Sequence, residues 1–174
     1  MYAAAREKNM TMLAEGTRAL QDSVAGVSEE QAKIRPAPGR WSVLECVEHL
    51  ILAENGMFEL LTIRSAPAAS PCDGSREEIF ARSLTNRGRK IEAPEFARPT
   101  GRFLSLAAAI AEFCRCRARA AGYLEHCEDD LRARTATHPV AGPVSCQELL
   151  IILAFHPARH ALQIREIRQS LQLP

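Results

Sequence analysis

The sequence lacks an excess of charge of either sign. Its 22 lysine and arginine residues are balanced by 21 aspartate and glutamate residues, so the formal net charge is +1. The arginines are interleaved with acidic residues, as on a solvent-exposed helix surface. Proteins that bind nucleic acids or anionic membranes usually present a basic patch or stripe to them. We therefore expect neither nucleic acid nor a membrane among the partners of this chain.

Long hydrophobic runs are also missing. The longest uninterrupted apolar run, Leu149–Phe155, is far shorter than the roughly 20 residues that a transmembrane helix needs. The stretch Met1–Met10 carries charges and lacks the apolar core of a signal peptide. We therefore expect a cytoplasmic protein.

No C-x-x-C pair and no regular cysteine spacing occurs in the sequence. In a chain without an export signal, reduced thiols are the default. The spacing assigns no role to any of the six cysteines, which are Cys46, Cys72, Cys114, Cys116, Cys127 and Cys146.

The remaining composition is that of an ordinary globular protein. Apolar residues make up 47% of the 174 residues, and charged residues make up 25%. A chain of this length can bury a hydrophobic core within one compact domain. We expect residues 1–174 to form a single domain.

Helix signals dominate the sequence, and no convincing strand pattern occurs. The first amphipathic stripe steps by threes and fours, as the buried face of a helix does. It consists of Met10, Leu13, Thr17, Leu20, Val24 and Val27. Further helices are predicted over Ser42–Arg64, Ser75–Lys90, Phe103–Glu128 and Ser145–Leu171.

Two of the long predicted helices begin with a capping box. In this motif a serine and a glutamate three residues later satisfy each other's free amide groups at the helix start. The boxes are Ser42-Val43-Leu44-Glu45 and Ser145-Cys146-Gln147-Glu148.

Segments rich in helix-breaking residues separate the helices, namely Ser65–Gly74, Ile91–Gly101 and Asp129–Val144. Four long helices without a convincing strand predict an all-α fold, and the natural form is a four-helix bundle. The long connection between the second and third long helices predicts a crossover instead of a simple hairpin.

Two histidines stand four residues apart in the last predicted helix. His156 and His160 share one helix face and continue the stripe of core positions, so both imidazoles can bind one metal ion. His49, on the second long helix, is the candidate third ligand, because bundle metal sites are built from facing helices. Three imidazoles leave a coordination position open, as in catalytic zinc sites. The alternative is a set of buried histidines that hydrogen-bond to carbonyl groups or water.

The histidines belong to two longer motifs, Trp41-x3-Glu45-x3-His49 and His156-x2-Arg159-His160-x2-Gln163-Ile164. These motifs and the order of the helices resemble the DinB-like (DinB/YfiT) superfamily. The resemblance implies an up-down-down-up four-helix bundle that frequently forms homodimers. It also implies that the three histidines bind a divalent metal ion such as zinc or nickel. Some members of the family use the thiols bacillithiol or mycothiol in S-transfer or isomerisation.

From the three-histidine set and this resemblance we expect a metal-dependent enzyme that acts on a small molecule. The reaction would be either S-transfer with a low-molecular-weight thiol or hydrolysis by activated water. Two alternatives stay open. One is a non-catalytic bundle that binds a metal or ligand during stress, and the other is a purely structural bundle with polar core histidines.

Several neighbouring residues have more than one interpretation. Glu45 is an acceptor that orients an imidazole, a general base, or only the capping-box glutamate. Gln163 is either a core amide or a contact of a polar pocket. Arg159 is expected in a surface or interhelix ion pair, with contact to a substrate as the alternative. His126 and His138 follow no partner pattern, so we expect both at the solvent-exposed surface.

Three further residues are expected to shape the surroundings of the histidines. Trp41 should pack against the entry of the second long helix, and Cys46 should behave as a small buried apolar residue. Pro157 removes an amide donor and clashes with the carbonyl four residues earlier, so it predicts a kink or a loosened turn beside His156.

Overall fold

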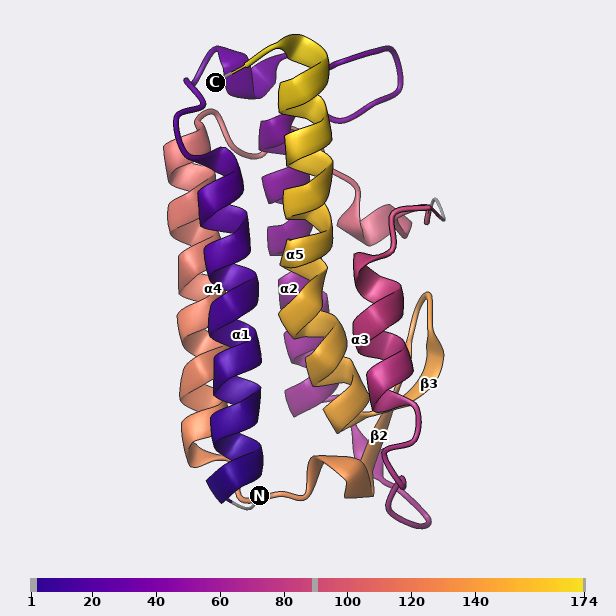
Figure 1. Ribbon diagram of the computed structural model, residues 1–174. Coiled ribbons are helices and arrows are strands. Elements are labelled where there is room, and N and C mark those ends of the chain that lie inside the picture. Colours follow the sequence, from indigo (N-terminus) through magenta and orange to yellow (C-terminus); the bar gives the residue numbers. More distant parts are fainter. Residues whose placement is uncertain (1–2, 89–90, 174) are drawn as a thin grey trace.

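The computed structural model describes residues 3–88 and 91–173, which form a bundle of long helices with a small sheet at one end (Figure 1). Among these residues, no helix is both long and apolar enough to cross a membrane. The elements in chain order are α1 (Ala3–Val24), the 3₁₀ helix η1 (Gln31–Lys33), α2 (Val43–Thr62), β1 (Ala66–Pro67), α3 (Glu77–Thr85), η2 (Glu95–Ala97), α4 (Leu106–His126), η3 (Leu131–Ala133), β2 (Arg134–His138), β3 (Gly142–Ser145) and α5 (Cys146–Leu171).

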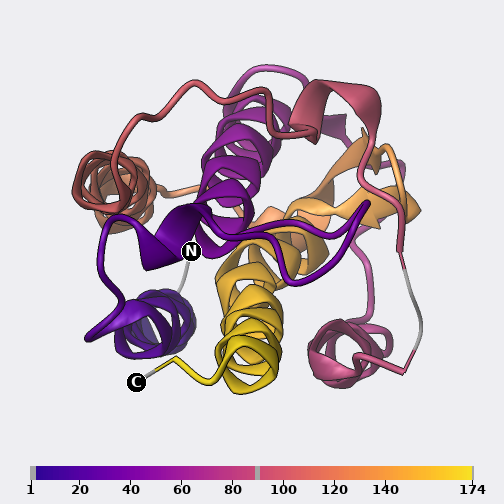
Figure 2. The same ribbon diagram turned by 90° about the horizontal axis from the view of Figure 1, so that it is seen from above.

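The long helices form a ring in the order α1, α4, α2, α5. Helix α1 packs against α4 and α5, and α2 packs against the same two helices (Figure 2). Helices α1 and α5 run in one direction, while α2 and α4 run in the other (Figure 1). The chain therefore has the up-down-down-up order that the resemblance implies. Helices α2 and α4 are parallel neighbours, which confirms that a crossover joins them.

The crossover from α2 to α4 carries β1, α3 and η2. Helix α3 packs along α5 outside the ring of long helices (Figures 1 and 2). It spans Glu77–Thr85 and is shorter than the predicted helix Ser75–Lys90. The last residue of that prediction, Lys90, lies outside the described residues.

The expectation of a chain without strands is wrong at one end of the bundle. Strands β2 and β3 form an antiparallel hairpin in which Thr135 pairs with Ser145 and His138 pairs with Gly142. Strand β1 joins the free edge of β2. The hairpin occupies most of the predicted irregular loop Asp129–Val144. Its strands are short and are held by backbone pairing, so they show no apolar alternation that a sequence pattern could reveal.

Side-chain caps define where the long helices begin. Both predicted capping boxes are present, with Ser42 and Glu45 at α2 and with Ser145 and Glu148 at α5. The start of α4 is also capped from a distant part of the chain, because Glu29 accepts hydrogen bonds from two amides of its first turn. In each case a side-chain oxygen satisfies amides that have no partner inside the helix.

The hydrophobic core is divided into two clusters along the bundle. One cluster includes Leu13, Leu149 and the sheet residue Val144, so it lies toward the sheet. The other includes Leu20 and Phe113 and lies toward the opposite end. Every long helix contributes to both clusters.

A buried polar layer, consisting of Glu54, Arg117 and the α5 turn Leu153–Pro157, lies at this junction. Proline has no amide hydrogen, so the carbonyl of Leu153 loses its helical partner. Arg117 donates to that carbonyl oxygen over 2.8 Å, and the same nitrogen lies 2.8 Å from Glu54 Oε1. Helix α5 is continuous through Pro157 and bends part-way along its length (Figure 1). The predicted kink is therefore present without a break in the helix.

The two charged residues of the polar layer are almost inaccessible to water. Glu54 is 1% exposed and Arg117 is 4% exposed. Burial raises the pKa of Glu54 to about 7 although Arg117 opposes this shift, and neither carboxylate oxygen has a well-formed hydrogen bond among the described residues. Burial also lowers the pKa of Arg117. Removing either partner would leave the other charge buried and uncompensated.

The backbones of α1 and α5 approach closely at Gly16. A Cβ atom added at Gly16 would collide with the Ala154 carbonyl oxygen, whereas one added at Gly122 would meet nothing within 4 Å. We expect Gly16→Ala to lower the free energy of unfolding by roughly 1–3 kcal/mol, because a close-packed interface cannot absorb the methyl group. Gly122→Ala should raise it by up to about 1 kcal/mol, because alanine favours a helix. Urea denaturation compares the two variants, and a stabilising Gly16→Ala would contradict the close approach.

The raised pKa of Glu54 predicts a specific pH dependence of stability. Between the ordinary value of 4.5 and about 7, the folded state holds a proton that the unfolded state releases. The free energy of unfolding therefore falls as pH rises through this window. Glu54→Gln removes this contribution, which we expect to be on the order of 1–3 kcal/mol between pH 5 and pH 8. Urea denaturation of both proteins at the two pH values measures it, and an identical pH dependence would refute the assignment.

Candidate metal centre

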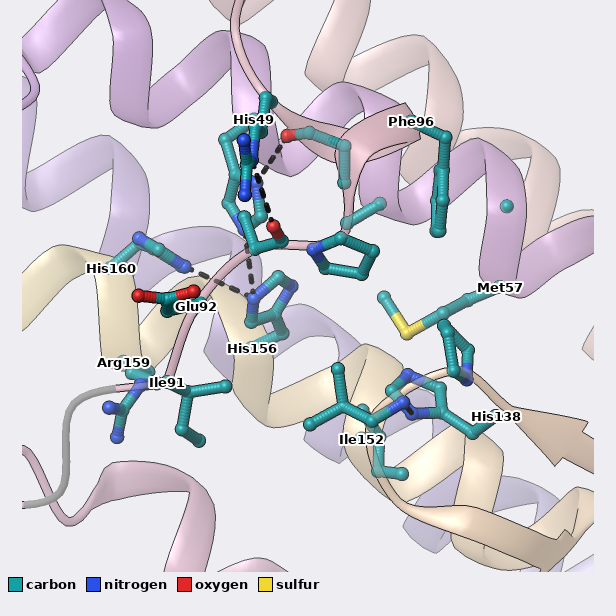
Figure 3. A pocket seen from close by; sticks show the side chains of 18 of the residues that line it. His49, Met57, Ile91, Glu92, Phe96, His138, Ile152, His156, Arg159 and His160 are labelled. Atoms are coloured by element: carbon teal, nitrogen blue, oxygen red, sulfur yellow. Dashed lines mark hydrogen bonds between the residues drawn. The ribbon is translucent and has the colours of Figure 1, made fainter.

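The three predicted metal-ligating residues come together between α2 and α5. His49 lies about two turns into α2, and His156 and His160 lie one turn apart on α5 (Figure 3). One ligand atom from each residue lies within 4.8 Å of the others. Nε2 of His156 is 3.4 Å from Nε2 of His49 and 3.1 Å from Nε2 of His160.

This spacing fits one metal ion held by imidazole nitrogens. Two nitrogens bound to a tetrahedral zinc ion at about 2.0–2.1 Å lie about 3.3 Å apart. The observed Nε2–Nε2 distances of 3.1 and 3.4 Å lie on either side of that value. Among the described residues, the group contains no cysteine and no carboxylate. An ion held here would keep a coordination position for a small molecule.

A hydrogen bond fixes the orientation of His49. Its Nδ1 atom lies 2.6 Å from the carbonyl oxygen of Ala97 in η2, so Nδ1 carries the proton and donates it. Nε2 of His49 then keeps its lone pair for a cation. The Nδ1 atoms of His156 and His160 are buried and have no hydrogen-bond partner within the described parts of the chain. The rings of His156 and His160 instead contact each other and the ring of His49.

The segment that carries Ala97 is anchored by Glu48, which precedes His49 on α2 and is 1% exposed. Its carboxylate accepts hydrogen bonds of 2.7–3.2 Å from the backbone amides of residues 100–102. One buried carboxylate thus ties the crossover to the helix that carries His49. No sequence pattern pointed to Glu48, because its partners lie 52–54 residues later in the chain.

All three imidazoles are held in the neutral form. Burial lowers the pKa of His156 and of His160 well below the ordinary value of 6.5, and neighbouring histidines and arginines lower both further. Burial also lowers the pKa of His49, against the opposing effect of the hydrogen bond to Ala97. A metal ion binds an unprotonated nitrogen. At neutral pH it would not have to displace a proton from these rings.

The three histidines line a cavity of about 1140 Å³. Part of its wall is apolar and includes Met57, Phe96 and Ile152 (Figure 3). Five arginines and three glutamates also line it, so its charged groups carry an excess of positive charge. The cavity can therefore take a molecule that has both an apolar and an anionic part.

Trp41 and Glu45, both in the first motif, have different surroundings. The ring of Trp41 lies 4.8 Å from that of His49, centroid to centroid, and forms part of the cavity wall. Glu45 accepts a hydrogen bond from the Ser42 amide and pairs with Arg35. Burial opposes ionisation of Glu45, but the hydrogen bonds from Arg35 and Ser42 outweigh it and lower its pKa. Glu45 thus occupies its capping position and does not line the cavity.

The polar residues of the second motif connect α5 to the end of α3. Arg159 is 6% exposed and donates to the carbonyl of Leu84, so it is a buried interhelix contact and not a surface residue. Gln163 accepts a hydrogen bond of 3.3 Å from Arg87, which also forms an ion pair of 2.7 Å with Glu166. Gln163 lines the cavity, which agrees with its interpretation as a polar pocket contact.

All six cysteines are free, and none of them lines the cavity. Cys46 lies one turn before His49 and is fully buried, and burial raises the pKa of its thiol. It therefore has the character of a small apolar side chain, as expected. The cavity has no thiolate from the described chain.

The two remaining histidines differ from each other. His126 is exposed, as expected, and donates from Nδ1 to the carbonyl of Gly122 over 2.9 Å. His138 is half-buried and lines the cavity, so the expectation of a surface position is wrong. No apolar alternation marked this strand in the sequence. Alternation along Arg134–His138 places His138 on the same strand face as the buried Ala136.

Two proteins of known sequence or structure are similar to this chain over most of their length. The uncharacterized protein YuaE of Bacillus subtilis (strain 168) is 22% identical over 154 residues, which cover 87% of this chain and 91% of YuaE. The structure of YfiT from Bacillus subtilis matches with a TM-score of 0.62 and 18% identity, covering 100% of this chain and 91% of YfiT. YfiT is described as a probable metal-dependent hydrolase with an unusual four-helix bundle topology. At this identity the likeness to YfiT shows the fold.

The family profile of the DinB superfamily matches residues 12–164. The matched region contains His49, His156 and His160 together with α2, α3, α4 and the sheet. The match agrees with the family that the two histidine motifs indicated. The chain belongs to the DinB superfamily.

Proposed function

We propose that this protein is a metal-dependent hydrolase that acts on a small molecule. The observation that carries the proposal is the convergence of three neutral imidazoles, those of His49, His156 and His160, at the wall of a large cavity. YfiT, described as a probable metal-dependent hydrolase, supports it through the shared fold. Zinc or nickel is the proposed ion, because both accept imidazole ligands readily.

The residues of the chain would have distinct tasks in such a reaction. A bound divalent ion would supply Lewis-acid activation of a water molecule or of a substrate carbonyl group. Nε2 of each histidine would hold the ion, and the Ala97 carbonyl keeps the proton of His49 on Nδ1. Trp41 and the apolar wall would keep bulk water away from the bound molecule.

A thiol-dependent transfer is the second candidate, and the size of the cavity favours it. Its volume of about 1140 Å³ exceeds the roughly 300–1,000 Å³ of common small-molecule sites, so a substrate and a thiol have room together. The thiol would be a low-molecular-weight cosubstrate, because no cysteine lines the cavity. The excess of arginine in the wall suits an anionic partner.

Removing one imidazole should greatly weaken metal binding. We expect His49→Ala to lower the affinity for zinc by at least about 100-fold, because even indirect supporting contacts contribute 10- to 100-fold. His126→Ala is the matched control, since His126 lies outside the cavity and bonds to its own helix. Isothermal titration with zinc and with nickel, on protein purified without a metal column, measures both. Equal affinities of His49→Ala and the unmodified chain would refute the assignment.

Turnover should depend on the same histidines. The zinc- or nickel-loaded protein should hydrolyse at least one compound in a panel of small esters, amides and phosphate esters. A chelator should abolish the activity, and His49→Ala should lack it while His126→Ala keeps it. A parallel panel that pairs small thiols with an electrophile distinguishes S-transfer, which requires the thiol. Metal binding without turnover in either panel would instead indicate a non-catalytic binding protein.

A further inference from the structure

His138 lines the same cavity as the three clustered histidines but comes from another structural unit. It is the last residue of β2 and precedes the turn to β3. Figure 3 shows it on the same side of the cavity as Met57 and Ile152, with His49 and His160 on the other side. It is not a member of the group whose ligand atoms converge.

The hairpin turn determines which ring nitrogen of His138 carries a proton. Nδ1 accepts hydrogen bonds from the backbone amides of Val140 and Ala141, at 3.2 and 3.0 Å. A ring nitrogen that accepts hydrogen bonds carries no proton of its own. Burial lowers the pKa of His138, so the ring is neutral at pH 7. Its one N–H group is therefore on Nε2.

The Nε2–H group of His138 is directed away from the hairpin turn, because the two nitrogens lie on different edges of the ring. Both hydrogen bonds of this ring to the described residues are made by Nδ1. Because His138 lines the cavity, Nε2–H is a donor that an acceptor group of a molecule bound in the cavity can engage in place of water. A donor that loses water without gaining an acceptor carries a free-energy penalty, so the site discriminates between molecules.

We propose that His138 is a substrate-binding residue that selects molecules with a hydrogen-bond acceptor at the end remote from the three clustered histidines. A carbonyl, amide or carboxylate oxygen would serve as this acceptor. The inference rests on the proposed function, because that function places the reacting group of the substrate at the three histidines. Met57 and Ile152, on the His138 side, suit a hydrocarbon portion. The substrate class is therefore a small hydrolysable molecule with an apolar middle and a hydrogen-bond acceptor at its far end.

Metal-anchored probes test this placement on the zinc-loaded full chain. Two series of straight-chain hydroxamic acids of equal length are compared, one ending in a methyl group and the other in a primary carboxamide. The hydroxamate group anchors each probe at the metal, and isothermal titration gives the ratio of the two dissociation constants. At the chain length that reaches His138, we expect the carboxamide probe to bind about three- to tenfold more tightly, the effect of one net hydrogen bond.

Two variants distinguish loss of the Nε2–H donor of His138 from loss of the folded structure. His138→Asn keeps an oxygen that can accept hydrogen bonds from the hairpin amides, but its side chain is too short to place a donor where Nε2 lies. The preference for the carboxamide probe should therefore be lost. The melting temperature should stay close to that of the unmodified chain. His138→Gln can place an amide donor there and should retain the preference. The same ratio in all three proteins would overturn the role of His138. Failure of both probes to bind the unmodified protein would overturn the proposed metal-dependent function, and the inference with it.

Nuclear magnetic resonance of ¹⁵N-histidine-labelled protein gives a readout that needs no metal ion. The ring nitrogens of His138 should show the Nε2–H tautomer from pH 7 upward. Adding the carboxamide-ended probe to zinc-loaded protein should shift the Nε2 resonance more than the methyl-ended probe does. An Nδ1–H tautomer would refute the inference even if the three clustered histidines bind metal.

Discussion

A carbonyl group without a helical partner is the constraint on which the middle of the bundle depends. Pro157 cannot donate to Leu153, and a buried carbonyl left unpaired would cost on the order of 1–3 kcal/mol. Arg117 supplies the donor from α4, and its buried charge in turn requires Glu54 from α2. Pro157 on α5 is thus linked through the Leu153 carbonyl to one buried polar residue on each of two other helices. These polar groups lie where the two apolar clusters meet.

The part of α5 around Pro157 also carries two of the three histidines that line the cavity. His156 and His160 lie on either side of Pro157 on α5 and close to His49, while burial and the nearby arginines keep the rings unprotonated. On the opposite wall, Glu48 anchors the crossover whose carbonyl orients His49. The ligand atoms are therefore placed by groups that belong to three separate segments. Such preorganisation lowers the free-energy cost of assembling a site around an ion.

The sequence predicted the features that arise from residues close together along the chain. Regular apolar stripes and two Ser-x-x-Glu boxes located the long helices, and the shared helix face of His156 and His160 followed from their spacing. The groups that support these side chains could not be found in this way. Glu48 and Arg117 bind backbone atoms that are distant in the sequence. Every residue type has a backbone carbonyl, and all but proline have an amide hydrogen, so the sequence does not reveal which residues are their partners. His138 was missed because its strand is recognisable only once its partner is in place.

The up-down-down-up order of the helices has a consequence for folding during translation. The imidazoles of His49 and His156 are separated by 107 positions in the chain, and the second belongs to α5, which follows the other three long helices. The first of them emerges earlier, but the three-histidine cluster cannot form until α5 has left the exit tunnel and docked between α1 and α2. Non-local contacts of this kind form late. A chain that stops before α5 therefore lacks His156 and His160 and cannot form the three-histidine cluster.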